Sequence, residues 1–266
     1  MKTLEIRRAR PLLGTWVEIT VRGANETVLH RAVQRAFDAI AALEARLSAH
    51  DPASDVSRLN RAAHRSAIRV TPDTWNVMAA ALHFSRASDG AFDVTIQRGG
   101  SVSGFDALAL TAGAYVRFHR PERVDLGGIA KGYCVDRAVA VLKASGISAG
   151  LVNAGGDLRA FGAAAFELCL RHPDGEQLIP CEPLRDAALA TSAVYPDHAR
   201  YAGLVRDGRD GRPLESATSI SVRAPTALVA DALTKIVGVL GARAEPLLAH
   251  YGARAWVVGI AGARAA

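Results

Sequence analysis

The most regular hydrophobic pattern in the chain follows Asn25. Apolar residues recur there at intervals of three or four, at Leu29, Val33, Phe37, Ile40, Leu43 and Leu47. This spacing places them on one face of a helix, and asparagine commonly caps the N-terminus of a helix. The pattern therefore predicts a long helix that packs against a core and ends at Asp51-Pro52.

Other helical patterns are bounded by capping residues. Thr71-Pro72 is typical of a cap followed by proline in the first turn, and it predicts a helix that ends before Gly90. A further helix is expected from Ile129 to a stop at Gly146. The apolar spacing predicts two more helices, over residues 227–240 and 244–250.

Alternating apolar and polar residues predict strands. The alternation is clearest over residues 16–21, which suits a half-exposed strand. The other expected strands are 150–152, 158–161, 166–171, 188–191, 219–223 and 255–259. The polar stretch 55–60 is expected to be a connection, and the glycine-rich segment from Thr95 to Leu110 to be irregular. Because helices and strands mix without a strict βαβ alternation, we expect an α+β fold that forms one domain over residues 1–266.

Composition restricts the classes of partner. The chain has 266 residues, half of them hydrophobic, which is enough to bury a substantial core. Its net charge of +6 suits an anionic partner, but the basic residues are scattered, so we expect no nucleic-acid partner. No stretch has the length and apolar character of a transmembrane span, and the first twenty residues lack the pattern of a signal peptide. These features predict a cytoplasmic location.

Cysteine and histidine spacing gives no sign of a metal centre. Cys134, Cys169 and Cys181 form no C-x-x-C motif and are odd in number, so neither a disulfide framework nor a zinc site is expected. The eight histidines include no pair at metal-ligand spacing.

Gly127-Gly128 and Lys131 form the main candidate for binding chemistry. Glycines allow a ligand to approach the backbone closely, and a helix N-terminus with a nearby lysine favours an anion such as phosphate. The segment has neither the Walker A pattern nor the G-x-G-x-x-G spacing. A tight turn before an ordinary surface helix is therefore the alternative interpretation. Likewise, Asp231 and Lys235 have the i, i+4 spacing of an exposed ion pair on a helix.

Five short segments in a fixed order give this candidate a context. They are Leu13-Gly14-Thr15, Gly90–Asp93, Val124–Gly132 with its partner turn Asn153–Asp157, Ala190–Ser192 and Ala230–Leu233. Together they resemble the family of FAD:protein FMN transferases, the ApbE family. The resemblance covers nearly the whole chain.

The resemblance implies a fold of two intertwined α+β subdomains with FAD between them. It also implies a magnesium-dependent enzyme that moves FMN from FAD to a threonine hydroxyl of a flavoprotein and releases AMP. The implied cofactor-binding residues are Leu13, where the family usually has methionine, His50, where it often has an aromatic residue, and Ala91, Phe92, Asp93, Asp125 and Lys131. The carbonyl of Gly128 and the carboxylate of Asp231 match two metal ligands, and hard oxygen donors suit magnesium. Lys131 and Asp231 are the implied catalytic residues.

The chain departs from the family pattern in two places that bear on catalysis. The third metal ligand is usually a threonine four residues after the aspartate, and Lys235 stands there; Thr234 lies one residue earlier, about 100° around the helix. The family's histidine-containing motif appears as residues 204–211 without the histidine, which leaves Asp207 as a weak candidate base. An ammonium cannot ligate magnesium, so one hypothesis is that Lys235 replaces part of the metal's charge. Two alternatives stay open: a protein that binds FAD without transferring FMN, and an FAD hydrolase that yields FMN and AMP.

Overall fold

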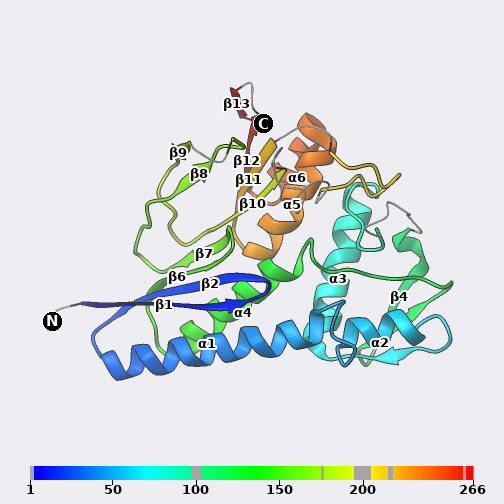
Figure 1. The fold of residues 1–266 in the computed structure, drawn as a ribbon, viewed down its shortest axis with the longest axis horizontal. Coiled ribbons are helices and arrows are strands. Elements are labelled where there is room, and N and C mark those ends of the chain that lie inside the picture. Colours follow the sequence, from blue (N-terminus) through cyan, green and yellow to red (C-terminus); the bar gives the residue numbers. More distant parts are fainter. Residues whose placement is uncertain are drawn as a thin grey trace.

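The largest element of the computed structural model is an antiparallel eight-stranded sheet (Figure 1). The structure describes residues 3–96, 104–174, 177–194, 205–214, 218–259 and 262–265. In spatial order the strands are β1 (Leu4–Leu12), β2 (Thr15–Gly23), β6 (Ala149–Ala154), β7 (Asp157–Phe161), β10 (Ala188–Val194), β11 (Thr218–Ala224), β12 (Arg254–Gly259) and β13 (Gly262–Ala265). Neighbouring strands pair antiparallel throughout.

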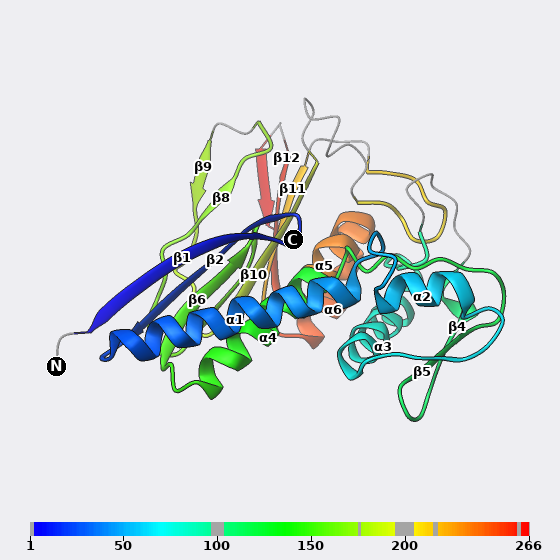
Figure 2. The same ribbon diagram turned by 60° about the horizontal axis from the view of Figure 1, so that its bottom comes forward.

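Three helices cover one face of this sheet. They are α1 (Glu26–Leu47), α4 (Ala130–Ala144) and α5 (Ala227–Leu240). Helix α4 packs between α1 and α5, and α5 lies against β10 and β11 (Figures 1 and 2). The strands alternate accordingly: Val152 of β6 belongs to the core under the helices, while its neighbour Leu151 belongs to a second buried cluster on the other face.

A small hairpin helps to cover that other face. It consists of β8 (Cys169–Arg171) and β9 (Leu178–Pro180). Leu170 from the hairpin packs with Leu158 and Leu189 of the large sheet in the second cluster. The sheet is therefore buried on both faces near its centre, by helices on one side and by the hairpin on the other.

A smaller part of the molecule lies at one end of α1 (Figure 2). It contains α2 (Asp55–Ala62), α3 (Pro72–Ala87), the 3-10 turn η1 (Phe105–Ala107) and a three-stranded sheet of β3 (Ile68–Arg69), β5 (Tyr115–Phe118) and β4 (Leu108–Thr111). The chain enters this part after α1 and leaves it before α4. One cluster of buried side chains continues through both parts. The predicted α+β class is confirmed; that residues 1–266 form a single domain stays a prediction.

The remaining helical elements lie beyond α5. They are η2 (Gly241–Ala244) and α6 (Glu245–His250), which lead into β12. Among the described residues, no helix has both the length and the hydropathy that crossing a membrane requires.

The helices largely match their sequence patterns. Asn25 caps α1 by accepting a hydrogen bond from the Val28 N–H, and Thr71 caps α3. Helix α5 has the predicted bounds, 227–240. Among the strands, β1 is not predicted, because it carries exposed arginines in place of an apolar alternation, and the strand expected over 166–171 is limited to Cys169–Arg171.

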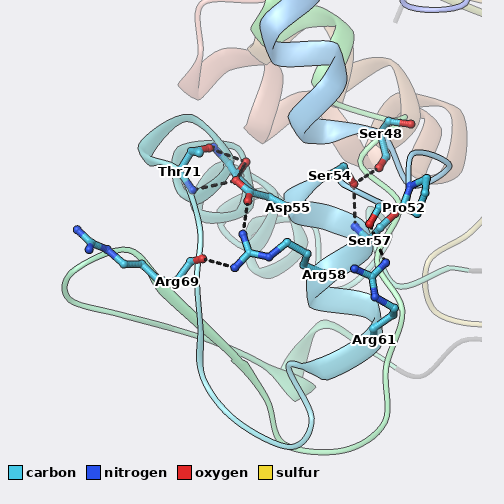
Figure 3. A network of polar contacts seen from close by, with 10 residues as sticks. Ser48, Pro52, Ser54, Asp55, Ser57, Arg58, Arg61, Arg69 and Thr71 are labelled. Atoms are coloured by element: carbon cyan, nitrogen blue, oxygen red, sulfur yellow. Dashed lines mark hydrogen bonds and ion pairs between the residues drawn. The ribbon is translucent and has the colours of Figure 1, made fainter.

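The expectation of a polar connection over residues 55–60 is wrong, because this stretch is helix α2. Ser54 caps the helix: its Oγ accepts from the Ser57 N–H at 2.9 Å and donates to the Ser48 carbonyl at 2.6 Å (Figure 3). The carboxylate of Asp55 accepts from the Thr71 N–H at 2.9 Å and pairs with Arg58 at 3.0 Å. A polar sequence therefore forms a helix here because its side chains bond to the segments on either side.

Candidate functional site

The structure contains a cavity of about 1190 Å³ at the meeting point of the β1–β2 turn, the end of α1, the start of α4 and the β8–β9 hairpin. Its volume is somewhat larger than the range typical of small-molecule sites, roughly 300–1,000 Å³. Aliphatic and aromatic side chains form much of its wall. The polar groups in the wall are contributed by segments that are far apart in the sequence.

The predicted site residues converge on this cavity, with one exception. Those that line it are Leu13, His50, Ala91, Phe92, Asp93, Asp125, Gly128 and Lys131. Asp231 is fully buried, and the side chain of Lys235, with which it pairs, lines the cavity in its place. The structure thus brings the predicted set together in space, while the role of each residue stays a prediction.

The β1–β2 turn holds Leu13 in the cavity wall. Leu13 and Gly14 form a two-residue connection with φ angles of 57° and 69°, the left-handed pair that matches the twist of a hairpin. For leucine this conformation costs roughly 1–2 kcal/mol. The N–H of Leu13 donates to Oε1 of Glu44 at 2.8 Å. Glu44, on α1, also lines the cavity, and no sequence pattern indicated it.

Asp93 holds the loop around it. Its Oδ1 accepts from the N–H and the hydroxyl of Thr95, both at 2.8 Å, and its Oδ2 accepts from the Phe105 N–H at 2.9 Å. Burial raises the pKa of this carboxyl above its usual value. Both oxygens of this implied cofactor-binding residue already accept hydrogen bonds from the chain.

Lys131 forms an ion pair with Asp157, the last residue of the second glycine turn. Asp157 is 1% exposed, and its other oxygen, Oδ1, is buried without a hydrogen-bond partner among the described residues. Burial alone would lower the pKa of Lys131, but the charges of Asp157 and Asp231 raise it above the usual value for lysine. The lysine is therefore charged, and Asp157 fixes it beside the cavity.

Asp231 lies between two helices. Its Oδ2 accepts from the backbone N–H of Gly132, in the first turn of α4, at 3.0 Å. Its Oδ1 pairs with Lys235, whose ammonium also donates to the backbone carbonyl of Asp231 at 3.0 Å. Since Asp231 is 0% exposed, the interpretation of an exposed i, i+4 pair is wrong. Both carboxylate oxygens are engaged by groups of the chain.

These contacts test whether the site fits magnesium. The Lys235 side chain also fills the space beside Gly128: a methyl group on that glycine would lie 3.8 Å from Cε of Lys235. The hydroxyl of Thr234 is buried, donates to the Asp231 carbonyl at 2.7 Å and lies 2.7 Å from Oγ of Ser192. A cation is already bound to Asp231, so these residues do not fit a divalent ion. Within the described ranges, no group of three or more histidine, cysteine, aspartate or glutamate side chains could hold a metal.

A second carboxylate also links α4 and α5, but it belongs to α4 and binds N–H groups of α5. Asp136 of α4 accepts from the N–H groups of Ala227 and Leu228, at the start of α5, at 2.9 Å each. Helix α4 approaches this end of α5 so closely that a methyl group on Gly132 would lie 2.3 Å from the Ala227 carbonyl oxygen. Each helix therefore supplies a carboxylate to free N–H groups of the other, which fixes Asp231 and Lys235 relative to α4.

In the segment without the histidine, the candidate Asp207 is engaged by an arginine. Asp207 forms a two-point ion pair with Arg209, at 2.8 and 2.6 Å, and this hydrogen bonding lowers the pKa of Asp207. Val205 and Arg206 line the cavity but Asp207 does not. Leu204, the first residue of the segment, lies outside the described residues. The ion pair with Arg209 and the position of Asp207 outside the cavity do not favour Asp207 as the base.

Comparison with solved structures confirms the fold. The structure of the ApbE protein from Thermotoga maritima aligns with a TM-score of 0.86 at 23% identity, over 99% of this chain and 97% of that one. The flavin transferase ApbE from Vibrio cholerae aligns with a TM-score of 0.83 at 21% identity, over 100% of this chain and 97% of that one. At this level of identity the likeness establishes the fold.

Comparison of sequences gives the family. The chain is 28% identical to the FAD:protein FMN transferase of Treponema pallidum, over 89% of this chain and 79% of that protein. It is 26% identical to the protein of the same name from Klebsiella pneumoniae, over 78% and 75% of the two chains. The model of the ApbE family matches residues 13–257. This chain belongs to the ApbE family.

Proposed function

We propose that this protein is an FAD:protein FMN transferase, which moves FMN from FAD to a threonine hydroxyl of an acceptor flavoprotein and releases AMP. The observation that carries the proposal is the convergence of eight residues from four distant segments on one cavity. The names of the relatives in the family support it. The acceptor, its threonine and the cytoplasmic location expected from the sequence stay predictions.

The cavity wall suits the two halves of FAD. We assign the apolar side chains of Leu13 and Phe92 to the flavin ring, because large apolar surfaces stabilise a flat aromatic ligand. We assign Gly128 and Lys131 to the phosphates, because exposed backbone and a charged ammonium at the start of a helix favour anions. Asp93 serves the site by binding the backbone N–H groups of Thr95 and Phe105 rather than by a direct bond.

In the proposed reaction, the threonine oxygen bonds to the phosphorus of the FMN half. The bond from that phosphorus to the bridging oxygen breaks, AMP leaves with the bridging oxygen, and the threonine proton is released to water. Catalysis of such a transfer consists mainly of positioning and of stabilising charge as it moves to the leaving group. Lys131 would stabilise that charge. Asp231 does not reach the cavity, so we assign it the positioning of Lys235 and of the first turn of α4.

Magnesium was implied by the resemblance, with Gly128 and Asp231 as ligands. The ammonium of Lys235 and the N–H of Gly132 occupy the two oxygens of Asp231. The proposal therefore assigns the chain's own groups to the phosphates and includes no step that uses a metal.

The test is to incubate the purified protein with FAD and an acceptor domain that carries the target threonine, and to measure AMP and denaturation-resistant flavin. The matched control is the same acceptor with that threonine replaced by alanine. We expect AMP and covalent flavin in equal amounts, only with the threonine-bearing acceptor. AMP and free FMN without an acceptor would indicate a hydrolase. FAD binding without AMP would indicate a binding protein, and either result would overturn the proposal.

A further inference from the structure

The Lys235 ammonium lies in an unusual position for a lysine. It belongs to α5, its side chain is 15% exposed, and it contacts both the carboxylate and the backbone carbonyl of Asp231. An ammonium has three N–H donors, and two of them are directed to these oxygens. The third has no acceptor among the residues that the structure describes, and Lys235 lines the cavity.

Asp231 requires a cation at this place. The carboxylate is fully buried, and a buried charge without a partner is strongly unfavourable. The N–H of Gly132 supplies a dipole to one oxygen and Lys235 supplies the full charge to the other. The cation that balances Asp231 is thus covalently part of the protein.

Lysine is rare in this chain. The only lysines in the sequence are Lys2, Lys131, Lys143 and Lys235, and arginine supplies the other basic side chains. Lys131 and Lys235 both line the cavity, each paired with a buried aspartate. A lysine is a compact point charge with donors that can rotate toward a phosphate oxygen.

We infer that the ammonium of Lys235 is the resident cation of this site, in the place where a divalent ion would bind, so that FAD binding and AMP release need no magnesium. This inference rests on the proposed function. Lys235 and Lys131 contact the two phosphates of FAD, and Asp231 keeps Lys235 in place. At position 235, a lysine that carries its own positive charge stands in place of a metal ligand.

The experiment measures FAD affinity by calorimetry, with EDTA or with millimolar magnesium, in four proteins. They are the wild type, Lys235→Thr, Lys235→Met and the control Lys143→Thr, whose lysine is half exposed and lies outside the cavity. We expect the wild type and the control to bind FAD equally well in both buffers. Loss of a charged hydrogen bond should weaken binding by Lys235→Met about tenfold or more in both buffers. Lys235→Thr should be equally weak in EDTA and should recover with magnesium, because a hydroxyl can join Asp231 as a ligand.

A spectroscopic measurement on the wild type covers the case in which the variants do not fold. With lysine labelled at ¹³Cε, the spectrum should contain one signal for each of the four lysines. We expect FAD to shift the Lys235 signal and magnesium alone to leave it unchanged. A Lys235 signal that moves with magnesium alone would show that the ion displaces the ammonium, and would overturn the inference.

The outcomes separate this inference from the proposed function. Wild-type binding or AMP release that falls about tenfold in EDTA overturns the inference and leaves the transferase proposal standing. An ion bound beside Oδ1 of Asp157, which has no partner among the described residues, would give that result too. If the wild type binds no FAD in either buffer, the proposed function fails and the inference fails with it.

Discussion

Replacing Asp136 with alanine should weaken the contact between α4 and α5. The carboxylate accepts hydrogen bonds from the N–H groups of Ala227 and Leu228 at 2.9 Å each, and from Arg159 at 2.6 Å. In the variant, two N–H groups at the start of α5 lose their acceptor and Arg159 loses its counter-charge. The helix that carries Asp231 and Lys235 would then keep its Thr226 cap, the bond from the Gly132 N–H to Asp231, the contact of Thr234 with Ser192 and its apolar packing.

The expected loss of stability follows from these bonds. A hydrogen bond to a charged group contributes about 1.5 kcal/mol at the low end of its range, so two contribute about 3 kcal/mol. The Arg159 pair is partly exposed and adds less than about 1 kcal/mol. We therefore expect Asp136→Ala to lower the free energy of unfolding by about 3–4 kcal/mol. Asp136→Asn keeps one acceptor oxygen and should lose about half as much.

Urea unfolding measures this effect, followed by tryptophan fluorescence and by circular dichroism. With a slope of about 3 kcal/mol per molar urea, the midpoint should fall by about 1 M for Asp136→Ala. The matched control is Asp186→Asn, which alters an exposed carboxylate that lies 4.0 Å from Lys143 of the same helix. Its midpoint should stay within about 0.2 M of the wild type. If Asp136→Ala unfolds at the same urea concentration as this control, the reciprocal capping of α4 and α5 does not stabilise the fold.

Three further predictions concern other parts of the structure. Gly132→Ala should destabilise by about 3 kcal/mol or more, because its methyl group would meet the Ala227 carbonyl at 2.3 Å; a thermal midpoint equal to that of the wild type would contradict the close packing. Burial favours the neutral form of Asp55, but hydrogen bonds from Thr71 and other neighbours lower its pKa below 3.8. The contribution of the Asp55 carboxylate to stability is present above pH about 4 and is lost as pH falls through the lowered pKa. The urea midpoint of Asp55→Asn should therefore change less with pH below 4 than the midpoint of the wild type. Burial raises the pKa of Cys134 to about 12, so maleimide should label it only upon unfolding and should label the exposed Cys169 at once; equal labelling rates in the native protein would refute this.

The sequence predicted the long helices because many residues in each of them repeat the same apolar spacing. Helix α1 has an apolar stripe from Leu29 to Leu47, over about five turns, and a capping asparagine, and α5 has apolar spacing along its whole length. Helix α2 has only two buried apolar residues, Val56 and Leu59, and its cap bonds to Ser48, in another segment. A pattern confined to eight residues is too short to outweigh a polar composition.

The sequence indicated which positions belong to the candidate site, but it did not indicate the contacts that these residues make with distant parts of the chain. Ordered motifs placed Leu13, Phe92 and Lys131 in one cavity. The partner of Lys131 is 26 residues away, and the N–H group that binds Asp231 is 99 residues away. Such contacts depend on how α4 packs against α5, which no local spacing encodes. The same packing turned an expected metal ligand into a buried counter-charge.

At Leu13, the residue that would stabilise the backbone differs from the residue that supplies an apolar side chain to the cavity. Glycine would adopt a φ of 57° without the cost that leucine bears, but it would remove an apolar side chain from the cavity wall. Selection of variants by melting temperature alone would therefore favour the loss of this side chain. At this turn, engineering for durability and engineering for ligand recognition lead to different amino acids.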